Sequence, residues 1–251
     1  MTDSVEKNEI GDVLEEERQT RVELAAAYRL AHHYGYTYMV YNHITARVPG
    51  EGHQFLINQY GLRYDEMTAS NLIKLNLDGD ITGGEGPVNR AGYVIHSAVH
   101  GAREDVQCVM HTHTMAGMAI SALEEGLLPL SQDAMGFYNR IAYHDYEGIA
   151  LDIDERERLV TDLGHHDAMI LRNHGLLTVG RTIGETFARM HNLERACQSQ
   201  LQAMATGREL RVPSPEVCER AASQIEGARS GGSAWKAMVR WLDDHDPSYR
   251  D

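Results

Sequence analysis

The sequence has few cysteines, few aromatic residues and no long apolar run. Its three cysteines, Cys108, Cys197 and Cys218, are far apart in a chain of 251 residues, which argues against a disulfide framework and suits a reducing compartment. No segment approaches the roughly 20 apolar residues that a membrane-spanning helix requires. The first residues are acidic and lack the apolar core of a signal peptide. We therefore expect a cytoplasmic protein without a membrane partner.

Basic residues are also scarce. Lys and Arg number 23 against 37 Asp and Glu, which gives a formal net charge of -14 at pH 7. This balance argues against nucleic acid and anionic membranes as partners, because both repel an acidic protein. Neither a G-x-G-x-x-G nor a Walker sequence occurs, which weakens the case for dinucleotide or nucleotide binding. Hydrophobic residues make up 42% of the chain, enough for the core of one large α/β domain.

Histidine is abundant by contrast, with 14 copies. His111 and His113 follow the apolar run 106–110, which is typical of a buried strand. Residues two apart in a strand point to the same side, so both imidazoles are expected to leave one face together. His174 follows a second apolar run, 168–171. Three histidines at strand ends match the three protein ligands of an open catalytic zinc site; the alternative is a set of partly exposed histidines that bind nothing.

Periodicity and turn residues predict the order of helices and strands. Helical spacing is found over residues 18–33, 91–102, 116–123, 154–163, 183–205, 216–228 and 234–242. Strand-like segments are 38–48, 54–58, 71–77, 106–113, 140–146, 168–174 and 176–180, of which the last two form a hairpin. Short turns join the early strands, and helices flank both ends, so we expect a mainly antiparallel sheet between helices. Residues 1–17 are polar and predicted to be a flexible segment before a single domain, 18–251.

Three motifs resemble the class II aldolase/adducin family. Residues 86–100 read GPVNRAGYVIHSAVH, residues 109–114 read VMHTHT, and residues 171–177 read LRNHGLL. The resemblance runs from about residue 18 to about residue 205. It implies a three-layer α/β/α sandwich around a mainly antiparallel sheet and, for enzymatic members, a cyclic homotetramer.

The same resemblance implies a metal centre. His111, His113 and His174 take the positions of the family's three histidine ligands, so we expect one divalent ion per chain. Zinc is the first expectation, although manganese, iron and nickel also accept imidazole. The ion would act as a Lewis acid that stabilises an enediolate when a carbon–carbon bond breaks.

The chain departs from the family's sugar-phosphate aldolases at two places. Their Pro-Ser-Ser-Glu motif supplies an acid/base carboxylate, whereas counting along this chain places Arg90 or Gly92 at the Glu position. Their phosphate loop is similar to Ile-Thr-Pro-Thr-Gly, whereas residues 57–61 read INQYG. Tyr60 in that loop would crowd a phosphate. We therefore expect a small, non-phosphorylated substrate and a different acid/base.

Four residues are candidates for the missing catalytic roles. Arg90 would hold a substrate carboxylate through a two-pronged hydrogen bond, or else form a surface ion pair. His96 would act as acid/base, or else fill a half-buried place on its helix. Tyr143 and His144 lie where the family's aldolases place a proton-donating tyrosine, and either side chain is a competent donor, although Tyr143 would equally fit a core.

Asn42 and His43 match the family's Gly-Asn-(Ile/Val)-Ser stretch near the substrate oxygens and, with Tyr60, are the substrate-binding candidates. The leading hypothesis is a metal-dependent carbon–carbon lyase that acts by decarboxylation or by retro-aldol cleavage. Decarboxylation does not need the missing Glu, and Arg90 suits a carboxylate. The alternatives are a non-catalytic adducin-like scaffold and a simple metal- or small-molecule-binding protein.

Overall fold

The computed structural model describes residues 2–50, 53–148, 154–228 and 232–251. Their strands form one eight-stranded sheet in the order β4-β3-β2-β1-β5-β8-β7-β6. All neighbours are antiparallel except β6 and β7, which are parallel. The strands are β1 (His43–Arg47), β2 (Phe55–Ile57), β3 (Ile73–Leu75), β4 (Ile81–Gly83), β5 (Cys108–Thr112), β6 (Ala142–His144), β7 (Ala168–Leu171) and β8 (Gly175–Gly180). The predicted sheet, including the β7–β8 hairpin, is confirmed.

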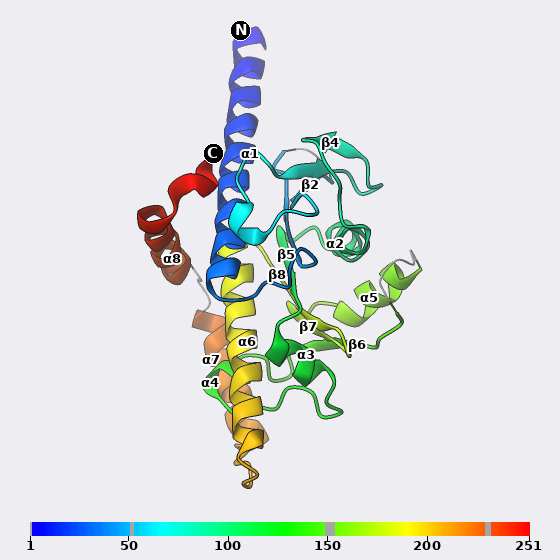
Figure 1. Cartoon of the computed structure of the whole chain (residues 1–251), viewed down its shortest axis with the longest axis vertical. Helices are drawn as coiled ribbons and strands as arrows, with labels where there is room; N and C mark the ends of the chain where they lie inside the picture. Colours follow the sequence, from blue (N-terminus) through cyan, green and yellow to red (C-terminus); the bar gives the residue numbers. More distant parts are fainter. Residues whose placement is uncertain (1, 51–52, 149–153, 229–231) are drawn as a thin grey trace.

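Helices cover both faces of this sheet (Figure 1). α1 (Thr2–His33) and α6 (Ile183–Ala205) lie on one face, with α8 (Gly232–His245) outside them, and α2 (Arg90–Ala102) and α5 (Glu155–Leu163) lie on the other. The remaining elements are α3 (Met115–Ser121), α4 (Gln132–Met135), α7 (Pro215–Ala228) and the 3-10 turns η1 (Tyr64–Glu66) and η2 (Pro247–Arg250). This arrangement is the expected three-layer α/β/α sandwich.

Alternation along β5 assigns its side chains to two separate cores. Cys108 and Met110 join the core under α1 and α6, whereas Val109 joins the core under α2 and α5. Because side chains two apart share a face, His111 lies on the same side as Val109. His111, one of the three histidines of the candidate metal site, therefore lies on the α2/α5 side of the sheet.

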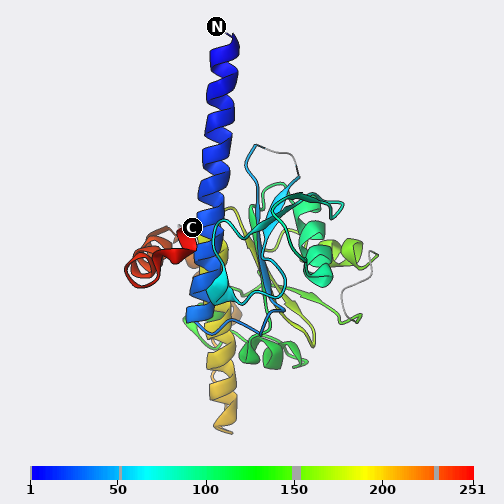
Figure 2. The same ribbon diagram turned by 45° about the horizontal axis from the view of Figure 1, so that its top comes forward.

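Helix α1 begins far earlier than its apolar periodicity indicates. It starts at Thr2, not at residue 18, and Figures 1 and 2 show its first turns extending beyond the rest of the molecule. Ion pairs one turn apart, Arg18 with Glu15 (2.7 Å) and Arg21 with Glu17 (2.8 Å), lie along the polar part of the helix. Such pairs support a polar stretch of helix, which apolar spacing does not reveal. Flexibility of residues 1–17 stays a prediction.

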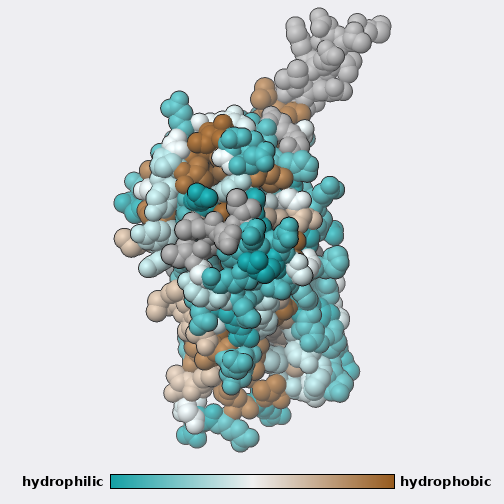
Figure 3. Space-filling model, turned by 90° about the vertical axis from the view of Figure 1, so that its right-hand side faces the viewer, coloured by the Kyte–Doolittle hydropathy of each residue, from teal (hydrophilic) through white to brown (hydrophobic). Residues whose placement is uncertain are grey.

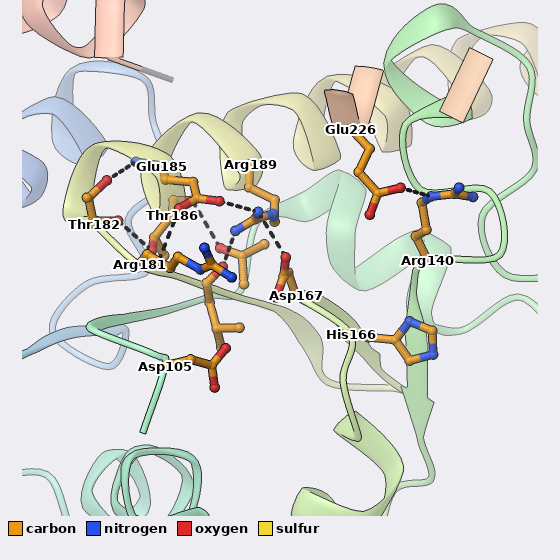
Figure 4. A network of polar contacts seen from close by, with 12 residues as sticks. Asp105, Arg140, His166, Asp167, Arg181, Thr182, Glu185, Thr186, Arg189 and Glu226 are labelled. Carbon is orange, nitrogen blue, oxygen red and sulfur yellow. Dashed lines mark hydrogen bonds and ion pairs between the residues drawn. The ribbon is translucent and has the colours of Figure 1, made fainter. Parts of the chain in front are cut away.

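A buried arginine fastens the β7–β8 hairpin to α6 (Figure 4). The Arg189 guanidinium binds Asp167, just before β7, at 3.1 Å and Glu185 at 2.8 Å. It also donates to the carbonyl of Val179 in β8. A charge buried in this way needs such partners to offset its desolvation. The network ties together the ends of the two strands whose connecting turn carries His174.

The outer surface of the α2/α5 side is mainly hydrophilic, with hydrophobic residues gathered near its upper and lower ends (Figure 3). Among the described residues, none of the helices combines the length and apolarity needed to cross a bilayer.

Candidate metal centre

The structure brings the three predicted ligands together. His111 lies in β5, His113 follows directly after it, and His174 lies in the turn between β7 and β8. Since Thr112 pairs with Leu176 across β5 and β8, that turn closes beside the end of β5. One nitrogen of each ring can be chosen so that all three lie within 4.8 Å of one another. The Nε2 atoms of His111 and His113 are 2.7 Å apart.

Hydrogen bonding and burial prepare these rings to bind a cation. The Nδ1–H of His111 donates to the carbonyl of Leu176 at 2.9 Å. Nε2 of His111 is therefore unprotonated, and its lone pair is directed at His113. A carbonyl that fixes the tautomer in this way is the usual outer partner of a metal-binding histidine. Burial, followed by the charge of His174, holds the pKa of His111 well below its ordinary value. The donor set therefore fits a divalent transition metal such as zinc.

The other two rings are half-buried and leave the centre open on one side. Burial lowers the pKa of His113, and burial followed by the charge of His113 lowers the pKa of His174 to about 4. Both rings are thus unprotonated at neutral pH and ready to act as ligands. His113 and His174 are partly exposed whereas His111 is enclosed, so a bound ion would keep a position free for a substrate or water.

Two unusual backbone positions carry His174 to this place. Asn173 adopts a left-handed conformation with φ 56°, which asparagine tolerates better than most residues. A Cβ on Gly175 would lie 2.4 Å from the carbonyl oxygen of Thr112, so only glycine fits against β5 here. The turn therefore requires glycine at position 175 and favours asparagine at position 173, on either side of the candidate ligand His174.

A second group of histidines lies beside the first. His43 in β1 pairs directly with His111 in β5, and their ring centroids are 5.1 Å apart. Nδ1 of His43 is 2.7 Å from Nε2 of His96. The hydroxyl of Thr45 is then 2.6 Å from Nδ1 of His96 and 2.9 Å from Nε2 of His100. Two strand residues and two helix residues thus form one continuous buried hydrogen-bonded chain.

His144 also lies on the α2/α5 side of the sheet. Its Nδ1 is 2.7 Å from a carboxylate oxygen of Asp162, and its Nε2 is 3.6 Å from Glu155. Within the described part of the chain, this Nε2 is buried without a hydrogen-bond partner. A small cavity is lined by both His144 and His174. An imidazole oriented by a carboxylate, in the wall of a cavity that it shares with His174, has the arrangement of a proton-transfer group.

Tyr143 is not brought to the histidines. Strand alternation turns it to the opposite face, where it packs against the α1/α6 core. Its hydroxyl accepts a hydrogen bond from Leu127 N–H at 3.0 Å, and the guanidinium of Arg172 lies 4.4 Å from its ring centroid. Within this chain, Tyr143 therefore lies away from the three histidines and packs as the alternative expectation described, and its role as a proton donor stays a prediction.

The three remaining candidates lie at different depths. Arg90 is exposed at the first turn of α2, and its guanidinium has no ion pair or hydrogen bond with any residue that the structure describes. Tyr60 is half-buried, 6.4 Å from the ring of Tyr41. Asn42 is buried; its amide donates to the carbonyl of Tyr36 at 2.9 Å, while its Oδ1 has no partner among the described atoms.

Four contributing residues went unrecognised in the sequence: Thr45, His100, Glu155 and Asp162. One signal was available, because Thr45 is two residues from His43 on a strand and His100 is four from His96 on a helix. What the sequence lacks is the strand order that places β1 next to β5. Nothing in the sequence distinguishes Asp162 from the other acidic residues of its helix.

An α/β/α sandwich with three histidines at the strand ends of its mainly antiparallel sheet defines a class of protein, and comparison identifies the class. Residues 22–201 match the family described as "Class II Aldolase and Adducin N-terminal domain". The chain belongs to this family.

Three similar proteins illustrate its range. An aldolase II superfamily protein from Pseudomonas syringae has a solved structure with a TM-score of 0.90 and 49% identity, covering 94% of this chain and 96% of that one. L-fuculose 1-phosphate aldolase from Glaciozyma antarctica PI12 follows with a TM-score of 0.83 and 31% identity, covering 95% and 94%. Alpha-adducin of Rattus norvegicus is 46% identical over 76% of this chain, a region that makes up 26% of the adducin.

Proposed function

We propose that this protein is a divalent-metal-dependent carbon–carbon lyase that acts on a small, non-phosphorylated carboxylate or hydroxy-carbonyl compound. The observation that carries the proposal is the convergence of three unprotonated imidazoles, with the tautomer of His111 set by the carbonyl of Leu176. A bound ion, zinc in our first expectation, would stabilise the negative charge that develops on a substrate oxygen as the bond breaks.

The chain's own residues supply binding and proton transfer. Arg90, exposed and without an ion pair among the described residues, is suited to hold a substrate carboxylate through paired hydrogen bonds. Asp162 accepts the Nδ1–H of His144, so that Nε2 is the atom that exchanges a proton with the reacting carbon or oxygen. These roles favour decarboxylation over retro-aldol cleavage, because both reactions need a proton donor but retro-aldol cleavage also needs a base that removes the proton of a substrate hydroxyl.

Elemental analysis of the purified protein tests this proposal. We expect about one divalent ion per chain, lost in the His111→Ala/His113→Ala variant. The matched control changes two exposed histidines outside the centre, His53→Asn/His165→Ala, and should keep the ion. Asparagine is chosen for position 53 because that residue has φ 64°. A wild-type protein that takes up no zinc, manganese, iron or nickel would overturn the lyase proposal.

An adducin-like scaffold is the second candidate, favoured by the 46% identity to alpha-adducin. A scaffold does not require a metal or turnover. Release of carbon dioxide, or of an aldehyde, from a panel of non-phosphorylated hydroxy acids would exclude it if the release depends on the metal and on His111. The homotetramer stays a prediction, which light scattering of the same samples tests.

A further inference from the structure

A groove lies between α1, α8 and η2, on the side of the sheet opposite His111 (Figure 1). Its volume is about 390 Å³, within the range of roughly 300–1,000 Å³ that is typical of small-molecule sites. Its floor is apolar and consists of Val22, Ala26, Trp235, Val239 and Tyr249. Val239 is partly buried and the other four are buried. Such a floor favours the apolar part of a ligand, because that contact removes apolar surface from water.

The walls of this groove are fixed before any ligand binds. A Cβ on Gly184 would lie 2.5 Å from Cγ of Trp235, so this indole rests directly on α6. Arg29 in α1 binds Asp246, just before η2, at 2.7 Å. Both contacts hold the C-terminal elements against the rest of the domain. A ligand therefore meets a preformed groove and does not have to order it, a cost that otherwise lowers affinity.

Two unpaired cations line the α8 wall of the groove. Lys236 and Arg240 are exposed, and neither side chain has an ion pair or hydrogen bond with any residue that the structure describes. They lie four residues apart on one helix, a spacing at which like charges repel each other. An anion held between them would remove this repulsion and accept charge-assisted hydrogen bonds from both. This wall therefore favours a negatively charged group.

The other walls do not attract an anion. Arg250 in η2 already binds both carboxylate oxygens of Asp243, at 2.8 and 3.0 Å, so its charge is neutralised. The α1 wall carries the half-buried Glu23, which accepts a hydrogen bond from Gln19 at 3.0 Å and would repel an anion. The charges of the groove therefore give a ligand one orientation, with its anionic group toward α8 and its apolar part on the floor.

We propose that this groove binds a small amphipathic anion, with an aromatic or branched apolar body on the floor and one carboxylate or sulfonate group between Lys236 and Arg240. A groove of this volume accommodates a single small molecule, and the net charge of -14 disfavours an anionic membrane as the occupant. Both α8 and η2 lie outside residues 22–201, which match the family. The site therefore belongs to the C-terminal part of the chain and is independent of the proposed lyase.

Fluorescence titration of the full chain with 8-anilinonaphthalene-1-sulfonate tests this proposal, because the dye combines an aromatic body with one sulfonate. We expect about one dye per chain, with energy transfer from Trp235 in the floor. Lys236→Gln/Arg240→Gln should weaken binding about 10-fold or more. Arg208→Gln/Arg211→Gln is the matched control, since it removes the same charge from two exposed residues outside the groove, and it should bind the dye as the wild type does.

A neutral counterpart of the dye, N-phenyl-1-naphthylamine, separates the anionic contact from the apolar one. It should bind more weakly than the sulfonate to the wild type, and equally to the wild type and to Lys236→Gln/Arg240→Gln. Equal affinity of the two dyes for the wild type would overturn the proposal. An unchanged sulfonate affinity in Lys236→Gln/Arg240→Gln, or an equal loss in the arginine control, would overturn it as well.

Two further measurements address other occupants of the groove. Light scattering should give the same mass with and without saturating dye, whereas a lower mass with dye would assign the groove to a second copy of the chain. Vesicles of phosphatidylglycerol should not retain the protein, whereas retention that depends on Lys236 and Arg240 would assign it to a membrane surface. His111→Ala/His113→Ala should bind the dye as the wild type does, so failure of the metal centre and failure of the groove are seen separately.

Discussion

The buried histidines make the metal-free protein sensitive to mild acid. Burial holds the pKa values of His43 and His96 well below 6.5 and that of His100 near 3. A lowered folded-state pKa contributes stability that is complete above the unfolded value of 6.5 and is lost as the pH falls below it. Lowering the pH from 7.0 to 5.5 then decreases the free energy of unfolding by about 1.3 kcal/mol for each ring, or by about 4 kcal/mol for the three. The total free energy of unfolding of a protein domain is roughly 5–15 kcal/mol, so this loss is a large share of it.

The assay is urea unfolding at the two pH values with a chelator present. In His100→Gln, whose amide can still reach Thr45, we expect the loss between pH 7.0 and 5.5 to shrink by about 1.3 kcal/mol. The exposed-histidine control, His165→Gln, should keep the wild-type loss. Contributions from His111, His113 and His174 and from Glu194, whose pKa burial raises, are common to all three proteins. An equal loss in wild type and His100→Gln would show that His100 is already charged or exposed when folded, and the reasoning would fail.

Three further substitutions, one of them with a control variant, test the packing and the chemistry of the centre. Gly92→Ala should destabilise the protein by about 1–3 kcal/mol because its Cβ meets His43. The control on the same helix, Gly101→Ala, places its Cβ 3.6 Å from Leu77 and should stabilise the protein by about 0.5–1 kcal/mol. Urea midpoints measure both effects, and equal effects would contradict the predicted clash. Gly175→Ala should weaken zinc affinity about 10–100-fold, measured by competition with a chromophoric chelator, and unchanged affinity would mean that the turn does not set the position of its histidine. Asp162→Asn should keep the zinc content but lower turnover of a cleaved substrate about 10²-fold or more, and full activity would remove the proton-transfer role.

Local patterns were enough to predict most of the helices and strands and the convergence of three histidines. Period-two alternation put His111 and His113 on one side, and the glycine after His174 marked its turn. The same alternation assigns Tyr143 and His144 to opposite faces, but it does not say which face carries the site. That choice depends on the strand order, which brings together segments distant in the sequence.

Cross-strand neighbours were correspondingly harder to predict. The sequence does not distinguish Thr45 and His100 from other residues of their strand and helix. Their contact depends on the position of β1, which lies beside β5 and against α2. The N-terminal turns of α1 were missed because a local signal is absent, not because distant segments come together. Their sequence is polar and has no apolar periodicity, so it resembles that of a flexible segment.

The absence of a side chain at position 92 also bears on how such a centre changes over evolutionary time. A carboxylate side chain introduced at Gly92 alone would collide with His43, and a smaller residue at position 43 alone would leave His96 without its partner and a void beside the helix. Each single step is thus harmful in the background of the other residue. The two positions are therefore expected to change together or not at all.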